Sequence, residues 1–338
     1  MEKQSKNSIR EWKEKLKTFE KPRISASVRQ LINSVGPFLL LWVLAYFSLR
    51  VSFWLTLLCV IPAAGFLVRT FIIFHDCTHH SFFKNRKANK IVGMITGILT
   101  FCSYEQWKNE HNLHHATNGH LEKRGDGDIW TLTLQEYAQA SWIKRLLYRT
   151  YRNPIVMFIF GPLYIFLISY RFNRKNATKK EKRHVWMTNI ILTFIVLLLG
   201  STLGWKAFLL VELPLFYIAA FSGVWLFYVQ HQFEDGYFES GDNWNYVEAA
   251  LKGSSFYKLP KILQWFSGNI GYHHVHHLNS RVPNYQLEEA HKSDKRLQEV
   301  PTLTLWTSLK SLTFKLWDEQ SKKFIGNRDI RNFLRSEQ

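Results

Sequence analysis

Long apolar blocks alternate with strongly polar segments along this chain. Five apolar blocks cover residues 36–49, 51–74, 153–170, 185–200 and 205–230. A bilayer core about 30 Å thick needs about 20 helical residues, and several of these blocks approach or exceed that length with few internal charges. A water-soluble protein would need an improbably large polar shell to cover so many apolar helices. The pattern therefore predicts an all-α integral membrane protein.

Two apolar segments are less suited to crossing a bilayer. Residues 91–104 are too short and contain glycines, and Gly161-Pro162 interrupts the block at 153–170. We expect both segments to be re-entrant or interfacial. The remaining blocks then give four transmembrane helices, which place residues 231–338 on the same side as the N-terminus. Arg69 lies near the end of the second block and is expected to snorkel to the interface.

Charge predicts how the chain is oriented. The 338 residues carry 44 Lys and Arg against 26 Asp and Glu, a net charge of +18. Much of the excess lies in residues 1–30 and 171–183, beside the apolar blocks, which favours a membrane surface over nucleic acid. Both segments should be cytoplasmic, and residues 1–30 lack the apolar core of a signal peptide. We expect a basic cytoplasmic segment at 1–35, a membrane domain at 36–283 and a cytoplasmic segment at 284–338.

Composition excludes two other classes of protein. Aromatic residues make up 16% of the chain, which is too many for a disordered protein. Cys59, Cys77 and Cys102 are the only cysteines, so neither a disulfide scaffold nor a cysteine-rich zinc module is expected.

Ten of the 14 histidines fall in three short clusters, at residues 75–80, 111–115 and 273–277. Helical residues three or four positions apart share a face, so each cluster can present several imidazoles together. Neutral imidazole is the commonest metal ligand. Eight rings at ligand spacing are too many for one ion, so the pattern predicts two metals, with iron, zinc, copper and nickel all open. The eight are His75, His79, His111, His114, His115, His273, His276 and His277.

Further candidates lie around the clusters. His231 ends the last apolar block and is a possible ninth ligand, whereas the isolated His120, His184 and His291 are expected at the surface. Carboxylates near the clusters are candidates to accept the second ring N–H of a ligand histidine: Asp76, Glu105, Glu110, Asp126, Asp128, Glu234 and Asp235. Trp107, Trp130 and Tyr104 are candidates to line a substrate tunnel, with ordinary packing as the alternative.

The clusters, in their order and spacing, resemble a known family. HDCTHH at 75–80, HNLHH at 111–115 and GYHHVHHL at 271–278 are similar to the three histidine boxes of membrane-bound fatty acid desaturases. GDGDIW at 125–130 and VPNYQL at 282–287 extend the resemblance, which covers about residues 30–320 and is closest to bacillary acyl-lipid desaturases.

The resemblance implies a cytoplasmic helical cap that holds a non-haem di-iron site. Its ligands would be the eight clustered histidines, and His231 matches a further histidine that the family uses between the second and third boxes. Some relatives have an Asn that binds a bridging water, four positions before the histidine that His231 matches. In this sequence Phe227 occupies that position. Asn269, four positions before His273, is a weaker candidate for the same role. The motif assigns no role to the additional His80 and His274. A haem-binding His-Pro-Gly-Gly signature is absent from the sequence, so a separate ferredoxin- or flavodoxin-like electron donor is implied.

The implied reaction is the oxygen-dependent introduction of a cis double bond, at Δ5 by resemblance alone, into phospholipid acyl chains of the cell membrane. The active site would face the cytoplasm. A hydroxylase or ketolase with the same boxes remains an alternative, as do a membrane-anchored zinc hydrolase and a metal transporter. A transporter should hold its ligands at mid-membrane.

Overall fold

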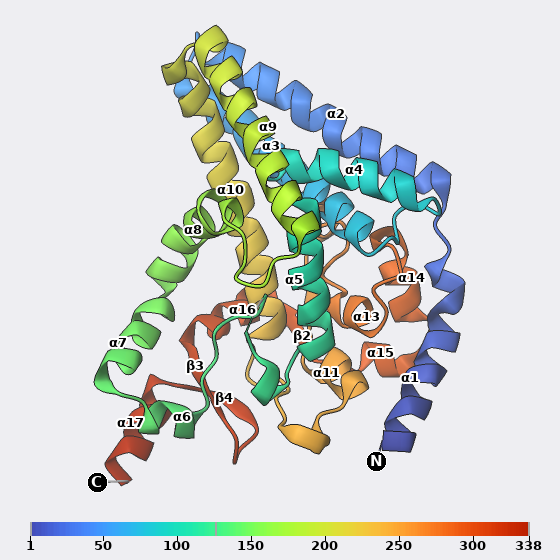
Figure 1. Ribbon diagram of the computed structural model, residues 1–338, viewed down its shortest axis with the longest axis vertical. Helices are drawn as coiled ribbons and strands as arrows, with labels where there is room; N and C mark the ends of the chain where they lie inside the picture. Colours follow the sequence, from blue (N-terminus) through green and yellow to red (C-terminus); the bar gives the residue numbers. More distant parts are fainter. Residues whose placement is uncertain (1, 126, 337–338) are drawn as a thin grey trace.

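Four long helices stand together at one end of the molecule, and the shorter elements gather at the other (Figure 1). The computed structural model describes residues 2–125 and 127–336. The long helices are apolar and long enough to cross a membrane, which confirms the four predicted spans. They are α2 (Ile24–Ser48), α3 (Phe53–Thr78), α9 (Lys179–Leu203) and α10 (Trp205–His231).

Local sequence signals set the ends of these helices. The Ser52 side chain caps α3 by accepting a hydrogen bond from the Trp54 backbone N–H at 3.2 Å. Thr178 and Glu181 form a reciprocal capping box at the start of α9. Gly204, with φ of +87°, turns the chain between α9 and α10 in a conformation that other residues rarely adopt.

Two details of the spans differ from expectation. Helix α2 begins at Ile24, so the expected boundary between residues 35 and 36 lies inside a continuous helix. The prediction that Arg69 snorkels is wrong, because its side chain is buried. Its guanidinium donates to the backbone carbonyl of Trp265 and lies 4.0 Å from the centre of the Trp265 ring.

The two segments expected to be re-entrant or interfacial are helical. Residues 86–99 form α4 (Arg86–Leu99), a 14-residue helix that exposes Ile91 and Ile95. The other segment contains η3 (Val156–Phe160), α8 (Gly161–Leu167) and η4 (Ser169–Arg171). It follows α7 (Trp142–Tyr151) with a 62° bend, as in a broken span or a re-entrant loop. Figure 1 shows α8 leaning towards α10 and α7 leading away from it.

The remaining elements form a mostly helical cap with two small sheets. Strand β1 (Phe256–Lys258) pairs in parallel with β2 (Thr302–Thr304), and β3 (Phe314–Asp318) pairs antiparallel with β4 (Lys323–Gly326). The all-α class is confirmed, with these sheets as additions. The other cap elements are α1 (Glu2–Leu16), η1 (Lys17–Glu20), α5 (Tyr104–Thr117), η2 (Leu121–Lys123), α6 (Leu134–Gln139), η5 (Gly241–Asn243), α11 (Tyr246–Lys252), α12 (Lys261–Phe266), α13 (His273–Leu278), η6 (Asn284–Gln286), α14 (Leu287–Lys292), α15 (Lys295–Gln298), α16 (Leu305–Ser308), η7 (Leu309–Thr313) and α17 (Asn327–Ser336).

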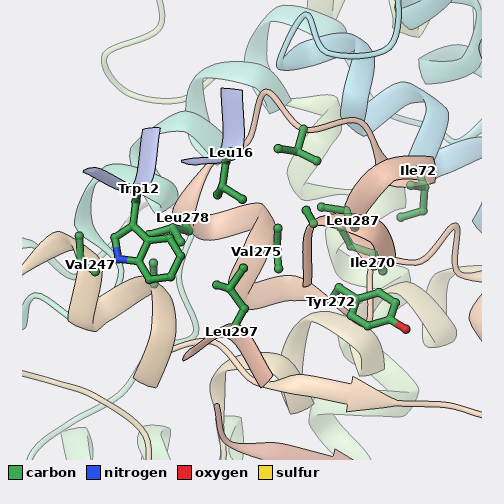
Figure 2. Packing of buried hydrophobic residues seen from close by; sticks show 13 residues of the cluster. Trp12, Leu16, Ile72, Val247, Ile270, Tyr272, Val275, Leu278, Leu287 and Leu297 are labelled. Atoms are coloured by element: carbon green, nitrogen blue, oxygen red, sulfur yellow. The ribbon is translucent and has the colours of Figure 1, made fainter. Parts of the chain in front are cut away.

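An apolar core inside the cap holds the third histidine cluster in place. Val275, on the same short helix as those histidines, is fully buried between side chains that come from distant parts of the sequence (Figure 2). Trp12 and Leu16 of α1 belong to this cluster, as do Leu287 of α14 and Leu297 of α15. A six-residue helix is too short to be stable alone, so this packing fixes α13.

Candidate metal centre

Four helices bring the predicted histidines together. Helix α3 ends at the first cluster, with His75 in its last turn and His79 as the residue after its end. Helices α5 and α13 carry the second and third clusters, and His231 is the last residue of α10. Histidines more than 150 positions apart in the sequence thereby become direct neighbours, such as His115 and His276.

The nine histidines lie in two separate groups. Within each group, ring nitrogens that can act as ligands all lie within 4.8 Å of one another. Helices α5 and α13 contribute to both groups, whereas α3 serves only the first and α10 only the second. The first group comprises His75, His79, His111, His115 and His276, and the second comprises His114, His231, His273 and His277.

The contacts inside each group fit metal ions better than hydrogen bonds. His276 Nε2 lies 3.0 Å from His75 Nε2 and 2.9 Å from His115 Nε2. In the second group, His231 Nε2 lies 3.2 Å from His114 Nε2 and 2.9 Å from His273 Nε2. A ring nitrogen either donates or accepts and cannot do both, so chains of such contacts are poorly satisfied by protons. A cation at the centre of each group would accept every lone pair at once.

Burial keeps these rings in the form that binds metal. It lowers the pKa of His79, His111 and His115 well below the usual 6.5, and neighbouring imidazoles lower these pKa values further. The same causes lower the pKa of His273, His276 and His277. The rings are therefore neutral near pH 7, with lone pairs available.

Hydrogen bonds outside the groups orient several rings. His75 Nδ1 lies 3.0 Å from Asp76 Oδ1, and the other oxygen of Asp76 accepts two hydrogen bonds from Asn284, at 2.7 and 2.8 Å. His114 Nδ1 lies 2.5 Å from Asp128 Oδ1, and His231 Nδ1 lies 3.1 Å from the Gly253 carbonyl oxygen. Each contact holds the ring so that Nε2 points into its group.

The other predicted carboxylates pair with cations. Glu105 lies 2.7 Å from Lys180, Glu110 lies 3.4 Å from Arg174, and Asp235 lies 3.2 Å from Lys323. Glu234 forms an ion pair with Lys310. Asp126 lies outside the described residues.

His80 and His274 belong to neither group. The His80 backbone has φ of +58°, and its ring nitrogen lies 3.1 Å from the Lys108 ammonium. His274 Nε2 lies 3.1 Å from His291 Nδ1 instead. Asn269 donates a hydrogen bond to the Asn284 carbonyl oxygen at 3.4 Å. The ring of Phe227 lies 5.1 Å from the rings of both His114 and His231, so an aromatic side chain borders the second group.

The prediction that His120, His184 and His291 lie at the surface is wrong, since the exposed fraction of each is 8% or less. Each has a partner distant in the sequence, which a local pattern does not reveal. His120 packs against the Trp244 ring, His184 lies near Tyr104, and His291 pairs with His274.

A cavity of about 710 Å³ leads from the histidines between the long helices. His75, His111 and His273 line its inner end, and its walls are mainly apolar side chains of α3, η3, α8 and α10. Trp107 lines it as predicted. Tyr104 instead donates to the Cys77 carbonyl oxygen at 3.0 Å, and Trp130 packs on Tyr148.

The α10 wall of this cavity was not predicted from the sequence. Ala219, Ala220 and Gly223 line it, and a Cβ added at Gly223 would meet no atom within 4 Å. These small residues stand out in a block otherwise rich in large apolar side chains, and that contrast is the signal that was available.

The fold and the site define a membrane protein whose buried histidines form two groups that could hold metal ions. The family model described as fatty acid desaturase matches residues 52–307. The chain is 55% identical over 314 residues to a fatty acid desaturase of Bacillus subtilis, which covers 93% of this chain and 89% of that protein. The chain therefore belongs to the fatty acid desaturase family.

More distant relatives have more specific names. The sn-1 acyl-lipid omega-3 desaturase (ferredoxin) of Synechocystis sp. is 30% identical over 239 residues, which cover 67% of this chain and 63% of that protein. The sn-1 oleoyl-lipid 12-desaturase of Synechocystis sp. is 26% identical over 238 residues, which cover 68% and 65% respectively. The chain thus spans slightly less than two thirds of these two relatives.

Proposed function

We propose that this protein is an oxygen-dependent acyl-lipid desaturase that introduces a cis double bond into phospholipid acyl chains. The observation that carries the proposal is the apolar cavity that ends at the two histidine groups. Its volume suits a long alkyl chain, and its walls offer such a chain apolar contacts. Membership of the desaturase family supports the reaction.

The nine histidines are proposed to hold two iron ions, five at one site and four at the other. An alkyl C–H bond has no acidic proton and no leaving group, so side chains alone cannot break it. Iron with dioxygen supplies the required oxidising power when bound. Two hydrogens leave adjacent carbons, and dioxygen is reduced to water with two further electrons and two protons from outside.

This chain's own residues position the substrate and shield the site. The apolar walls from α3, α8 and α10 hold the alkyl chain and exclude water. Asp76 and Asp128 hold the rings of His75 and His114 in fixed orientations. The Phe227 ring lines the cavity beside the second group and adds an apolar surface there.

The orientation and the electron donor are parts of the same proposal. The basic segments at 1–30 and 171–183 favour a cell membrane in which the histidine groups face the cytoplasm. A separate ferredoxin- or flavodoxin-like protein would deliver the electrons, and the word ferredoxin in one relative's name supports this. A metal transporter is less consistent with the geometry, because the histidines lie at the ends of α3 and α10.

Expression in a host without desaturases tests the proposed reaction. The unsubstituted chain should produce mono-unsaturated phospholipids, with the double bond located by mass spectrometry of lipid extracts. His114→Ala and His276→Ala, one from each group, should abolish the product and leave membrane insertion unchanged. If the unsubstituted chain produced hydroxylated or keto lipids, the protein would be a hydroxylase or ketolase and not a desaturase.

A further inference from the structure

Two short cap helices expose large apolar side chains to the outside of the molecule. Trp306 of α16 is 82% exposed and Ile262 of α12 is 66% exposed. Leu263 and Trp265 of α12 are also exposed, as are Leu305 and Leu309 at the two ends of α16. Contiguous apolar side chains at a protein surface usually mark a contact with a membrane or a partner. We call these six residues the α12–α16 surface.

The paired strands β1 and β2 bring the two helices together. Although α12 and α16 are about 40 positions apart in the sequence, each follows one strand of the same parallel pair. Lys258 at the end of β1 is the register partner of Thr304 at the end of β2. Both strands therefore end at the same end of the pair, and α12 and α16 follow from that end.

The α12–α16 surface is continuous with the membrane-spanning helices. The Phe266 ring of α12 lies against Gly65 of α3, where it leaves no room for a Cβ, and Trp265 stacks edge-on against Phe66. Arg69 ties α3 to the carbonyl group of Trp265. These contacts lie 9 to 13 residues before the end of α3, well inside a helix that spans the membrane.

Contacts on the other side connect α16 to α10. The Tyr257 hydroxyl lies 3.1 Å from the Ser308 hydroxyl and accepts a hydrogen bond from the Trp225 indole at 3.2 Å. Tyr228 donates to the Ser311 carbonyl oxygen at 2.9 Å. Trp225 and Tyr228 lie in the last turns of α10, and Figure 1 shows α16 beside that end of the helix.

We propose that the α12–α16 surface inserts into the lipid–water interface of the leaflet nearest the histidine groups. Continuity with α3 and α10 places it at membrane level. Lys258 at the end of β1 and Lys261 at the start of α12 are exposed, and their ammonium groups suit anionic headgroups beside an inserted apolar face. Leu305, Trp306 and Leu309 then hold the segment 284–338 on the bilayer. This contact helps to fix the depth of the cavity relative to the acyl chains of that leaflet.

Fluorescent labelling of single introduced cysteines tests this insertion. The variants are Trp306→Cys and Ile262→Cys, each labelled with an environment-sensitive fluorophore. They are reconstituted in nanodiscs of phosphatidylethanolamine and phosphatidylglycerol that contain a lipid with a nitroxide on its acyl chain. Gln320→Cys, at an exposed position between β3 and β4, is the matched control from the same C-terminal region. The unsubstituted chain measures the background from Cys59, Cys77 and Cys102.

Labels at 306 and 262 should show blue-shifted emission and several-fold stronger quenching by the lipid nitroxide than the label at 320. If Trp306→Cys does not elute as a single folded species, Leu309→Cys tests the same surface. Emission at 306 and 262 as water-exposed as at 320 would overturn the proposal. Shielding that persists without lipid and grows with protein concentration would assign the surface to a second copy of the chain instead. The measurement requires no enzymatic activity, so its outcome is independent of the proposed reaction.

Discussion

Adjacent histidines in this chain have different environments because the backbone, rather than the motif, decides where each ring points. His79 follows the last turn of α3 and lies with the first group, whereas His80 has a positive φ and contacts Lys108. His114 and His115 are also adjacent but belong to different groups, since consecutive helical residues point about 100° apart.

The His79 and His80 pair gives a direct test at the residue scale. His79→Ala removes a member of the first group and should lower the iron content of purified protein, because fewer imidazoles remain there. His80→Ala should retain the iron content of the unsubstituted chain. Metal analysis by mass spectrometry measures both. Equal losses in the two variants would mean that the rings have been assigned incorrectly.

Asp128 should strengthen metal binding because it orients the ring of His114. In Asp128→Asn the side chain keeps its size but loses the charge that holds His114 Nδ1–H. Loss of such an outer contact typically weakens metal binding about 10- to 100-fold. Competition with a chelator measures the affinity, and Asp318→Asn, at the end of β3, is the matched control. An unchanged affinity in Asp128→Asn would show that this contact does not support the site.

At the element scale, long apolar helices were predictable and short cap elements were not. The spans follow from the apolar blocks once the interrupted block at 153–170 is set aside. Spacing within each cluster was only partly informative, because histidines four positions apart share a group, whereas His114 and His276 separate from the residues three positions before them. The division into two groups depends on how α3, α5, α10 and α13 meet, and this follows from packing between distant residues such as Trp12 and Val275. Short elements such as α12 and β2 have too few residues for a periodic signal.

Helix α10 offers a test of the cavity. Gly223→Leu should place a large side chain in the part of the cavity that the substrate's alkyl chain occupies. Desaturation of long acyl chains should fall by about tenfold or more, because the alkyl chain would no longer fit beside the histidines. Gly36→Leu in α2 is the matched control, because an added Cβ there also meets no atom within 4 Å but Gly36 does not line the cavity. Leu is a better helix former than Gly, so neither variant should unfold. The amount of unsaturated product is measured in lipid extracts. Equal activity in both variants would contradict the proposal that this cavity holds the alkyl chain.

At the scale of the whole molecule, charge and span count together predict the topology. Four spans return the chain to its starting side, so the cap that joins α1 to residues 232–336 can form on one face of the membrane. A reporter fused after residue 178, just before α9, should be cytoplasmic, and one fused after Gly204 should be external. An external signal at 178 would require the bent segment at 142–171 to span the bilayer.

The proposed reaction depends most on nine imidazoles that hold two iron ions. The direct measurement is the number and identity of metal ions per chain in catalytically active protein, made together with His114→Ala and His276→Ala. We expect two irons in the unsubstituted chain and at least one fewer in each variant, since the two residues belong to different groups. Active protein that contains zinc, a single ion or no metal would contradict the central claim.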